Sequence, residues 1–161
     1  MSTIISPPSQ PRPWLRIILR SLLALIVVLV TAGFIYENIS ETRDRRFNPM
    51  PGQLIDIGGY KLHIDCQGQG TPTVVLDSGL GESFITWRKV QPKISEFTRV
   101  CSYDRAGLGY SDSSPHARTG KDIAEELHAL LQHVGLAGPI ILVGHSAGGY
   151  DVRVYTSLYP D

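Results

Sequence analysis

Apolar and polar residues are arranged along the chain in patterns that predict different elements. Residues 21–36 form one uncharged apolar run. From Leu54 to Cys66, apolar residues occupy alternate positions on both sides of Gly58 and Gly59, which predicts two strands joined by a tight turn. Short continuous apolar runs are typical of strands buried on both faces. Three such runs occur, at residues 73–76, 99–103 and 140–143.

Between the second and third of these runs, the apolar spacing changes to that of a helix. From Gly120 to Val134, apolar residues recur three or four positions apart and so share one helix face, and Gly135 supplies a stop. Strands that alternate with helices predict an α/β fold. Over residues 53–161 we expect a mostly parallel sheet that opens with an antiparallel hairpin.

The run at residues 21–36 has the features of a membrane span. It is a little shorter than the ~20 residues that a bilayer crossing prefers, but the apolar residues 17–19 extend it. Trp14 and Tyr36 stand at its two ends, where interfacial aromatic residues are expected. We therefore predict a transmembrane signal anchor, and so a membrane contact, over residues 14–36.

The flanking segments indicate an orientation. Three arginines precede the run without an acidic neighbour, Arg12, Arg16 and Arg20. This positive-inside pattern predicts a single-pass protein with an extracytoplasmic globular part. We expect the Pro- and Ser-rich residues 1–13 to be disordered and the charged residues 37–52 to form a linker. Signal-peptide cleavage near residues 30–32 is the alternative, and it would yield a secreted protein.

Charge and cysteine content argue against two classes of function. The formal net charge is zero and no long basic run is present, which argues against a nucleic-acid partner. Cys66 and Cys101 lie far apart, with no C-x-x-C pair and no histidines at ligand spacing. We therefore expect no metal site, and nothing in the sequence implies an organic cofactor.

Candidate chemistry lies in Gly144-His145-Ser146-Ala147-Gly148, which has the spacing G-x-S-x-G. An apolar strand precedes the motif, and residues 149–159 can continue as a helix. A strand, a sharp turn and a helix around this motif form a nucleophile elbow, in which glycines avoid collisions and the serine hydroxyl points outward. The N–H of Ala147 would lie at a helix N-terminus, where it can stabilise an oxyanion. A serine that only caps the helix is the alternative.

With two further motifs, residues 50–161 resemble the α/β-hydrolase family. The segment Asp77-Ser78-Gly79-Leu80-Gly81 follows the run at 73–76 and takes the place of the family's His-Gly-x-Pro loop. Serine replaces the histidine of that loop, and a glycine replaces its proline. The resemblance implies that the N–H of Leu80 joins that of Ala147 in an oxyanion hole, in a loop shaped by Gly79. A plain glycine turn is the alternative.

The second motif is Tyr103–Ser111, which is similar to the family's D-x-R-G-x-G-x-S loop. The resemblance implies that Asp104 and Arg105 shape the loop beside the elbow and take no part in the chemistry. It also makes the strands of Cys66 and Cys101 neighbours, so a disulfide is one hypothesis and two small buried side chains are the other.

In this family the catalytic acid and histidine follow the serine in chain order. The sequence ends at Asp161, soon after the elbow, and is therefore expected to be truncated and inactive by itself. Asp151 lies on the wrong element for the acid. We expect His145 to pack beside the site without a catalytic role. The remaining histidines are expected in the opening hairpin (His63) and on the surface (His116, His128 and His133).

The resemblance implies a serine hydrolase that attacks carboxylic esters or related acyl compounds through Ser146. Aspartate occupies that position in the epoxide-hydrolase and haloalkane-dehalogenase branches of the family, so the serine argues against both. Two alternatives stay open. One is an acyltransferase or peptidase on the same fold, and the other is a catalytically inactive protein that binds a ligand.

Overall fold

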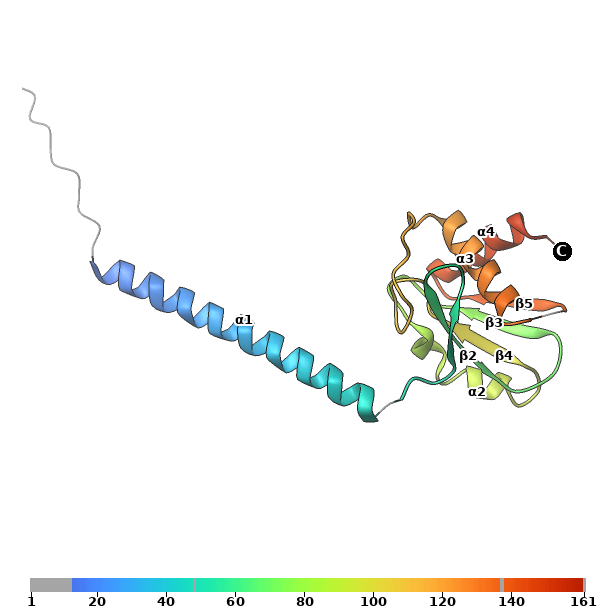
Figure 1. Ribbon diagram of the computed structural model, residues 1–161, viewed down its shortest axis with the longest axis horizontal. Helices are drawn as coiled ribbons and strands as arrows, with labels where there is room; N and C mark the ends of the chain where they lie inside the picture. Colours follow the sequence, from blue (N-terminus) through green and yellow to red (C-terminus); the bar gives the residue numbers. More distant parts are fainter. Residues whose placement is uncertain (1–12, 48, 137, 161) are drawn as a thin grey trace, which may run out of the picture. The chain divides into compact units, whose positions relative to one another are not determined.

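The structure is a computed structural model that describes residues 13–47, 49–136 and 138–160. The chain divides into two compact units, residues 1–49 and 50–161. The disorder expected for residues 1–13 falls, apart from Pro13, outside the described residues. A single helix makes up the first unit as far as it is described, and a sheet with helices makes up the second (Figure 1).

The helix of the first unit, α1, runs from Pro13 to Phe47. Its segment Trp14–Ser40 is long and apolar enough to cross a membrane, and none of it is buried. It is a candidate membrane span that includes the predicted residues 14–36. The helix also continues through most of the segment expected to be a linker. No Gly or Pro interrupts residues 37–47, and Glu and Arg are good helix formers.

The second unit is built on one mixed five-stranded sheet. Its strands are β1 (Gln53–Asp56), β2 (Lys61–Gln67), β3 (Thr73–Asp77), β4 (Val100–Tyr103) and β5 (Ile140–Gly144). Their order is β1-β2-β4-β3-β5. β2 is antiparallel to both of its neighbours, whereas β3 is parallel to β4 and β5. The α/β architecture with an opening antiparallel hairpin, predicted from the hydrophobic pattern, is confirmed.

Helices lie on both faces of this sheet (Figure 1). They are the 3-10 helix η1 (Phe84–Trp87), α2 (Gln91–Ile94), α3 (Gly120–His133) and α4 (Ala147–Leu158). Successive side chains of β3 point to opposite faces of the sheet, as in any β-strand. Val75 packs in the core under α3 and α4. Val74 and Leu76 pack on the opposite face with Trp87 of η1.

The prediction that residues 140–143 are buried on both faces is wrong. As far as the chain is described, β5 stands at the end of the sheet and pairs only with β3. Ile141 is 47% exposed and Val143 37% exposed, whereas the runs within β3 and β4 are fully buried. Within the described residues, α3 and α4 cover only the face to which Ile140 and Leu142 point.

A disulfide joins β2 to β4. Cys66 and Cys101 are directly opposite one another in the antiparallel pairing, with their Cα atoms 4.0 Å apart, and their sulfur atoms are bonded. Of the two hypotheses for these cysteines, the structure contains the bonded pair. In the chain-entropy model, closing a loop of this size stabilises a fold by about 3–4 kcal/mol.

Candidate active site

Ser146 occupies the sharp turn between β5 and α4. Its backbone has φ 51° and ψ −116°, and among the described residues it is the one non-glycine residue with positive φ. Such a conformation costs on the order of 1–3 kcal/mol and persists only where the surroundings hold it. Here the N–H of His145 donates to the carbonyl of Asp77 at 2.9 Å, and the N–H of Gly149 donates to the carbonyl of Ser146 at 2.9 Å.

The two glycines of the G-x-S-x-G motif are required by close backbone packing. A Cβ on Gly144 would collide with the backbone of Gly148, one turn ahead in the chain. A Cβ on Gly148 would collide with the carbonyl of Asp77 at the end of β3. The first turn of α4 can therefore approach β3 only because neither position carries a side chain.

Two backbone N–H groups near this turn are free to bind an anion. Ala147 is the first residue of α4, so its N–H has no partner within the helix. Leu80 lies in the loop after β3, and its side chain is 87% exposed. Neither N–H donates a hydrogen bond within the described residues. Ser146 Oγ also has no hydrogen-bond partner there, so no described group activates it.

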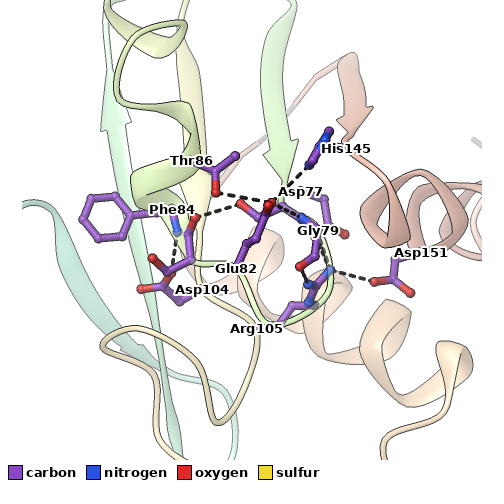
Figure 2. Close-up of polar contacts among 11 residues, drawn as sticks. Asp77, Gly79, Glu82, Phe84, Thr86, Asp104, Arg105, His145 and Asp151 are labelled. Atoms are coloured by element: carbon purple, nitrogen blue, oxygen red, sulfur yellow. Dashed lines mark hydrogen bonds and ion pairs between the residues drawn. The ribbon is translucent and has the colours of Figure 1, made fainter.

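Arg105 connects the loop after β3 to the helix α4. Its side chain is 6% exposed. Nη1 donates to Asp77 Oδ1 at 2.9 Å, to Asp151 Oδ2 at 2.9 Å and to the Ser78 carbonyl at 2.7 Å, and Nη2 donates to the Gly79 carbonyl (Figure 2). Burial raises the pKa of Asp77 to about 7, although the positive charge of Arg105 opposes that shift.

Asp104 gathers a second buried cluster. Its Oδ1 accepts from the N–H of Phe84 at 2.7 Å, and its Oδ2 accepts from the N–H of Tyr110 at 3.0 Å. Oδ2 also lies 2.9 Å from His63 Nδ1, and His63 Nε2 lies 2.7 Å from the Pro51 carbonyl. A carbonyl and a carboxylate can only accept, so both ring nitrogens carry a proton and His63 is a cation. Desolvation lowers the pKa of His63, but its bonds to Asp104 and Pro51 outweigh that effect and raise it.

A third group, Glu82, lies between the loop and the turn. Its Oε2 accepts from the N–H of Gly79 at 2.8 Å and lies 3.1 Å from His145 Nδ1 (Figure 2). The Gly79 N–H, and after it His145, lower the pKa of Glu82. From the sequence, His145 was expected beside the site. The contacts of Glu82 and the pairing of His63 with Asp104 were not expected.

Within the described residues, no hydrogen bond joins the other histidines to Ser146. His116 and His133 are exposed, as expected, whereas His128 is half-buried. His128 keeps partial contact with solvent, and its ring stacks on that of Tyr159 with centroids 3.8 Å apart. Among the described residues, no group of three His, Cys, Asp or Glu side chains is placed to hold a metal.

The chain is similar in sequence to several known proteins. Residues 72–161 match the family model of the alpha/beta hydrolase fold. Uncharacterized protein YbdG of Bacillus subtilis (strain 168) is 28% identical over 148 residues, which cover 91% of this chain and 46% of that protein. A soluble epoxide hydrolase of Corynebacterium sp. (strain C12) is 32% identical over 93 residues, which cover 58% of this chain and 32% of that protein.

The chain is also similar to proteins of solved structure. Wild-type Cfl2 from Burkholderia cenocepacia is similar with a TM-score of 0.64 at 26% sequence identity, over 70% of this chain and 40% of that one. The chain therefore spans less than half the length of each of these three proteins.

Proposed function

Because the chain belongs to the alpha/beta hydrolase fold family, we propose that its protein is a serine hydrolase acting on carboxylic esters or related acyl compounds. The observation that carries this proposal is the strained backbone of Ser146, held between β5 and α4 by glycines that cannot be replaced. A serine that only caps a helix takes extended φ and ψ and bonds its hydroxyl to the helix N–H groups. Ser146 does neither.

In the proposed reaction, Ser146 Oγ attacks the acyl carbonyl and passes its proton to a histidine outside this sequence. The carbonyl oxygen becomes an oxyanion, which the N–H groups of Ala147 and Leu80 stabilise. Loss of one such donor typically costs about 3–4 kcal/mol of transition-state stabilisation. The positive end of the α4 dipole favours the same charge. The proposed chemistry needs no cofactor.

A serine in this position also favours ester chemistry over epoxide opening. Relatives named epoxide hydrolases share the fold, but in that branch the family resemblance implies an aspartate nucleophile. An aspartate forms an ester with the opened epoxide, whereas a serine hydroxyl is suited to acyl transfer.

We also propose that α1 anchors the protein in a membrane, with the hydrolase unit on the extracytoplasmic side. Trp14–Ser40 supplies the span, and the arginines before it supply the orientation. The Cys66–Cys101 disulfide supports this side, because disulfides persist in oxidising compartments.

The test of the activity is labelling of the natural full-length protein with a fluorophosphonate probe. Wild type and Ser157→Ala should be labelled, because Ser157 is an exposed residue of α4 away from the turn. Ser146→Ala should not be labelled. Absence of labelling in wild type that is folded by circular dichroism would contradict the enzyme and favour a ligand-binding protein. If wild type is labelled, turnover of an ester panel would separate ester hydrolysis from acyl transfer or peptide cleavage.

A further inference from the structure

Glu82 contacts three separate segments with a single oxygen. Oε2 accepts from the Gly79 N–H at 2.8 Å and from Thr86 Oγ1 at 3.3 Å, and it lies 3.1 Å from His145 Nδ1 (Figure 2). These partners belong to the loop after β3, to η1 and to the turn after β5. The carboxylate thus connects the loop that carries Leu80 with the turn that carries Ser146.

Stability alone does not account for this arrangement. Glu82 and His145 are 39% and 55% exposed, and ion pairs with that much solvent contact contribute little to the free energy of unfolding. The packing is nevertheless tight. A Cβ on Gly79 would lie 2.8 Å from Glu82 Oε2 and 3.2 Å from His145 Nδ1.

The effect of Glu82 falls on one peptide group. Ser78 C=O and Gly79 N–H belong to the same planar peptide and point in opposite directions. Arg105 binds that carbonyl at 2.7 Å, and Glu82 binds that N–H at 2.8 Å, so the peptide is held at both ends. The next peptide, between Gly79 and Leu80, is held by its carbonyl, which Arg105 binds from the buried side. Its N–H, that of Leu80, is left free on the opposite side.

Glycine makes these bonds necessary. Gly79 lacks the steric restriction of a side chain, so the peptides on either side of it can rotate at little cost unless other groups hold them. Arg105 fixes the Ser78 and Gly79 carbonyls on the buried side, and Glu82 fixes the Gly79 N–H on the side of the turn. Without the Glu82 carboxylate, the Ser78–Gly79 peptide loses one of its two restraints. The Gly79–Leu80 peptide keeps the bonds to its carbonyl, but the Leu80 N–H is then held less firmly relative to Ser146.

We propose that Glu82 is a positioning residue that holds the Leu80 N–H toward Ser146 by bonding the Gly79 N–H and the His145 ring together. This inference rests on the proposed serine-hydrolase function. Glu82 does not touch the substrate, and it acts through the oxyanion donor. Because that donor is used in the transition state and not in substrate binding, its loss lowers kcat more than it raises KM.

The test compares Glu82→Ala, Glu82→Gln and a control, Glu96→Ala, in the full-length protein. Glu96 is an exposed glutamate whose one partner among the described residues is Lys93 at 3.2 Å, so its removal should change nothing. Glu82→Gln keeps an oxygen that accepts from the Gly79 N–H, whereas Glu82→Ala does not. We expect Glu82→Ala to lower kcat on a p-nitrophenyl ester by about tenfold to a hundredfold with little change in KM. Glu82→Gln should recover most of that loss, and the midpoint of thermal unfolding should stay the same.

Amide hydrogen exchange over residues 77–83 gives a second readout that does not depend on turnover. It should be faster in Glu82→Ala and close to wild type in Glu82→Gln. Unchanged exchange in Glu82→Ala would overturn the proposal, and so would a rise in KM at constant kcat. Unchanged kcat in a wild type that is labelled at Ser146 would overturn it as well. If wild type is not labelled at all, the enzyme proposal fails, and the exchange data still decide whether Glu82 restrains the loop.

Discussion

Asp104 and Arg105 are neighbours in the chain, yet their side chains form hydrogen bonds with different parts of the domain. Asp104 bonds the N–H groups of Phe84 and Tyr110 and the ring of His63. Figure 2 shows its bond to Phe84. Arg105 bonds the loop that carries Gly79 and the helix that follows Ser146.

The two clusters also differ in charge. The first pairs one carboxylate with one imidazolium and is neutral. The second sets two buried carboxylates, Asp77 and Asp151, against one guanidinium. The excess negative charge is relieved when Asp77 takes up a proton, since burial has raised its pKa to about 7. We conclude that the first cluster chiefly stabilises the fold, whereas the second also sets the geometry around Ser146.

The largest expected effect is on stability, from Asp104→Ala. This change leaves the buried His63 cation and two backbone N–H groups without their acceptor, so we expect a loss of about 3–5 kcal/mol in the free energy of unfolding. Urea unfolding of the full-length protein would measure it. As a control, Glu125→Ala removes an exposed carboxylate of α3 that pairs with Lys121 and should cost less than about 0.5 kcal/mol. A similar loss in both variants would remove the special role of Asp104.

Arg105→Lys should separate stability from activity. Lysine keeps the positive charge between Asp77 and Asp151 but lacks the planar fork that also reaches the Ser78 and Gly79 carbonyls. We expect a loss of about 1–2 kcal/mol in the free energy of unfolding. Because the loop is released, fluorophosphonate labelling should slow by about tenfold. Labelling at the wild-type rate would show that the loop does not need Arg105.

The smallest effect is a change in pH dependence. The folded-state pKa of His63 is raised, so its contribution to stability is complete below the unfolded value of about 6.5 and is lost as pH rises through the folded value. Asp77, with a pKa raised to about 7, also makes stability fall with pH, but only between about 4 and about 7.

A substitution of His63 tells the two groups apart, because Asp77 is present in both proteins and contributes equally to both. Urea unfolding of His63→Gln from about pH 6.5 upward should show a flatter dependence on pH than wild type, and the difference in slope is at most about 1.4 kcal/mol per pH unit for one proton. Equal slopes above about pH 6.5 would mean that the pKa of His63 is not raised in the folded protein.

The sequence predicted the features that depend on local pattern. Alternation around Gly58 and Gly59 predicted the hairpin, and the helical spacing predicted α3. The extension of α1 to Phe47 could also have been predicted, because residues 37–47 contain no helix breaker. Charge alone suggested a linker there, although Glu and Arg continue a helix readily.

Features that depend on distant partners could not be predicted. An apolar run does not reveal whether a strand is central or at an edge, so the exposure of Ile141 and Val143 was missed. Glu82 lies 63 residues before its partner His145, and His63 lies 41 residues before Asp104. A single polar residue carries no periodic signal, and its role follows only from the tertiary structure.

The position of β5 has a consequence for handling the protein. Among the described residues, no strand pairs with its outer edge, and the apolar Ile141 and Val143 face outward beside it. An unpaired apolar edge is a template for aggregation, since a strand of another molecule can add to it by ordinary backbone pairing. If residues 50–161 are prepared as a separate fragment, we expect aggregation, and not unfolding, to limit the protein concentration that can be used. A lysine at position 141 or 143 is the simplest way to protect that edge.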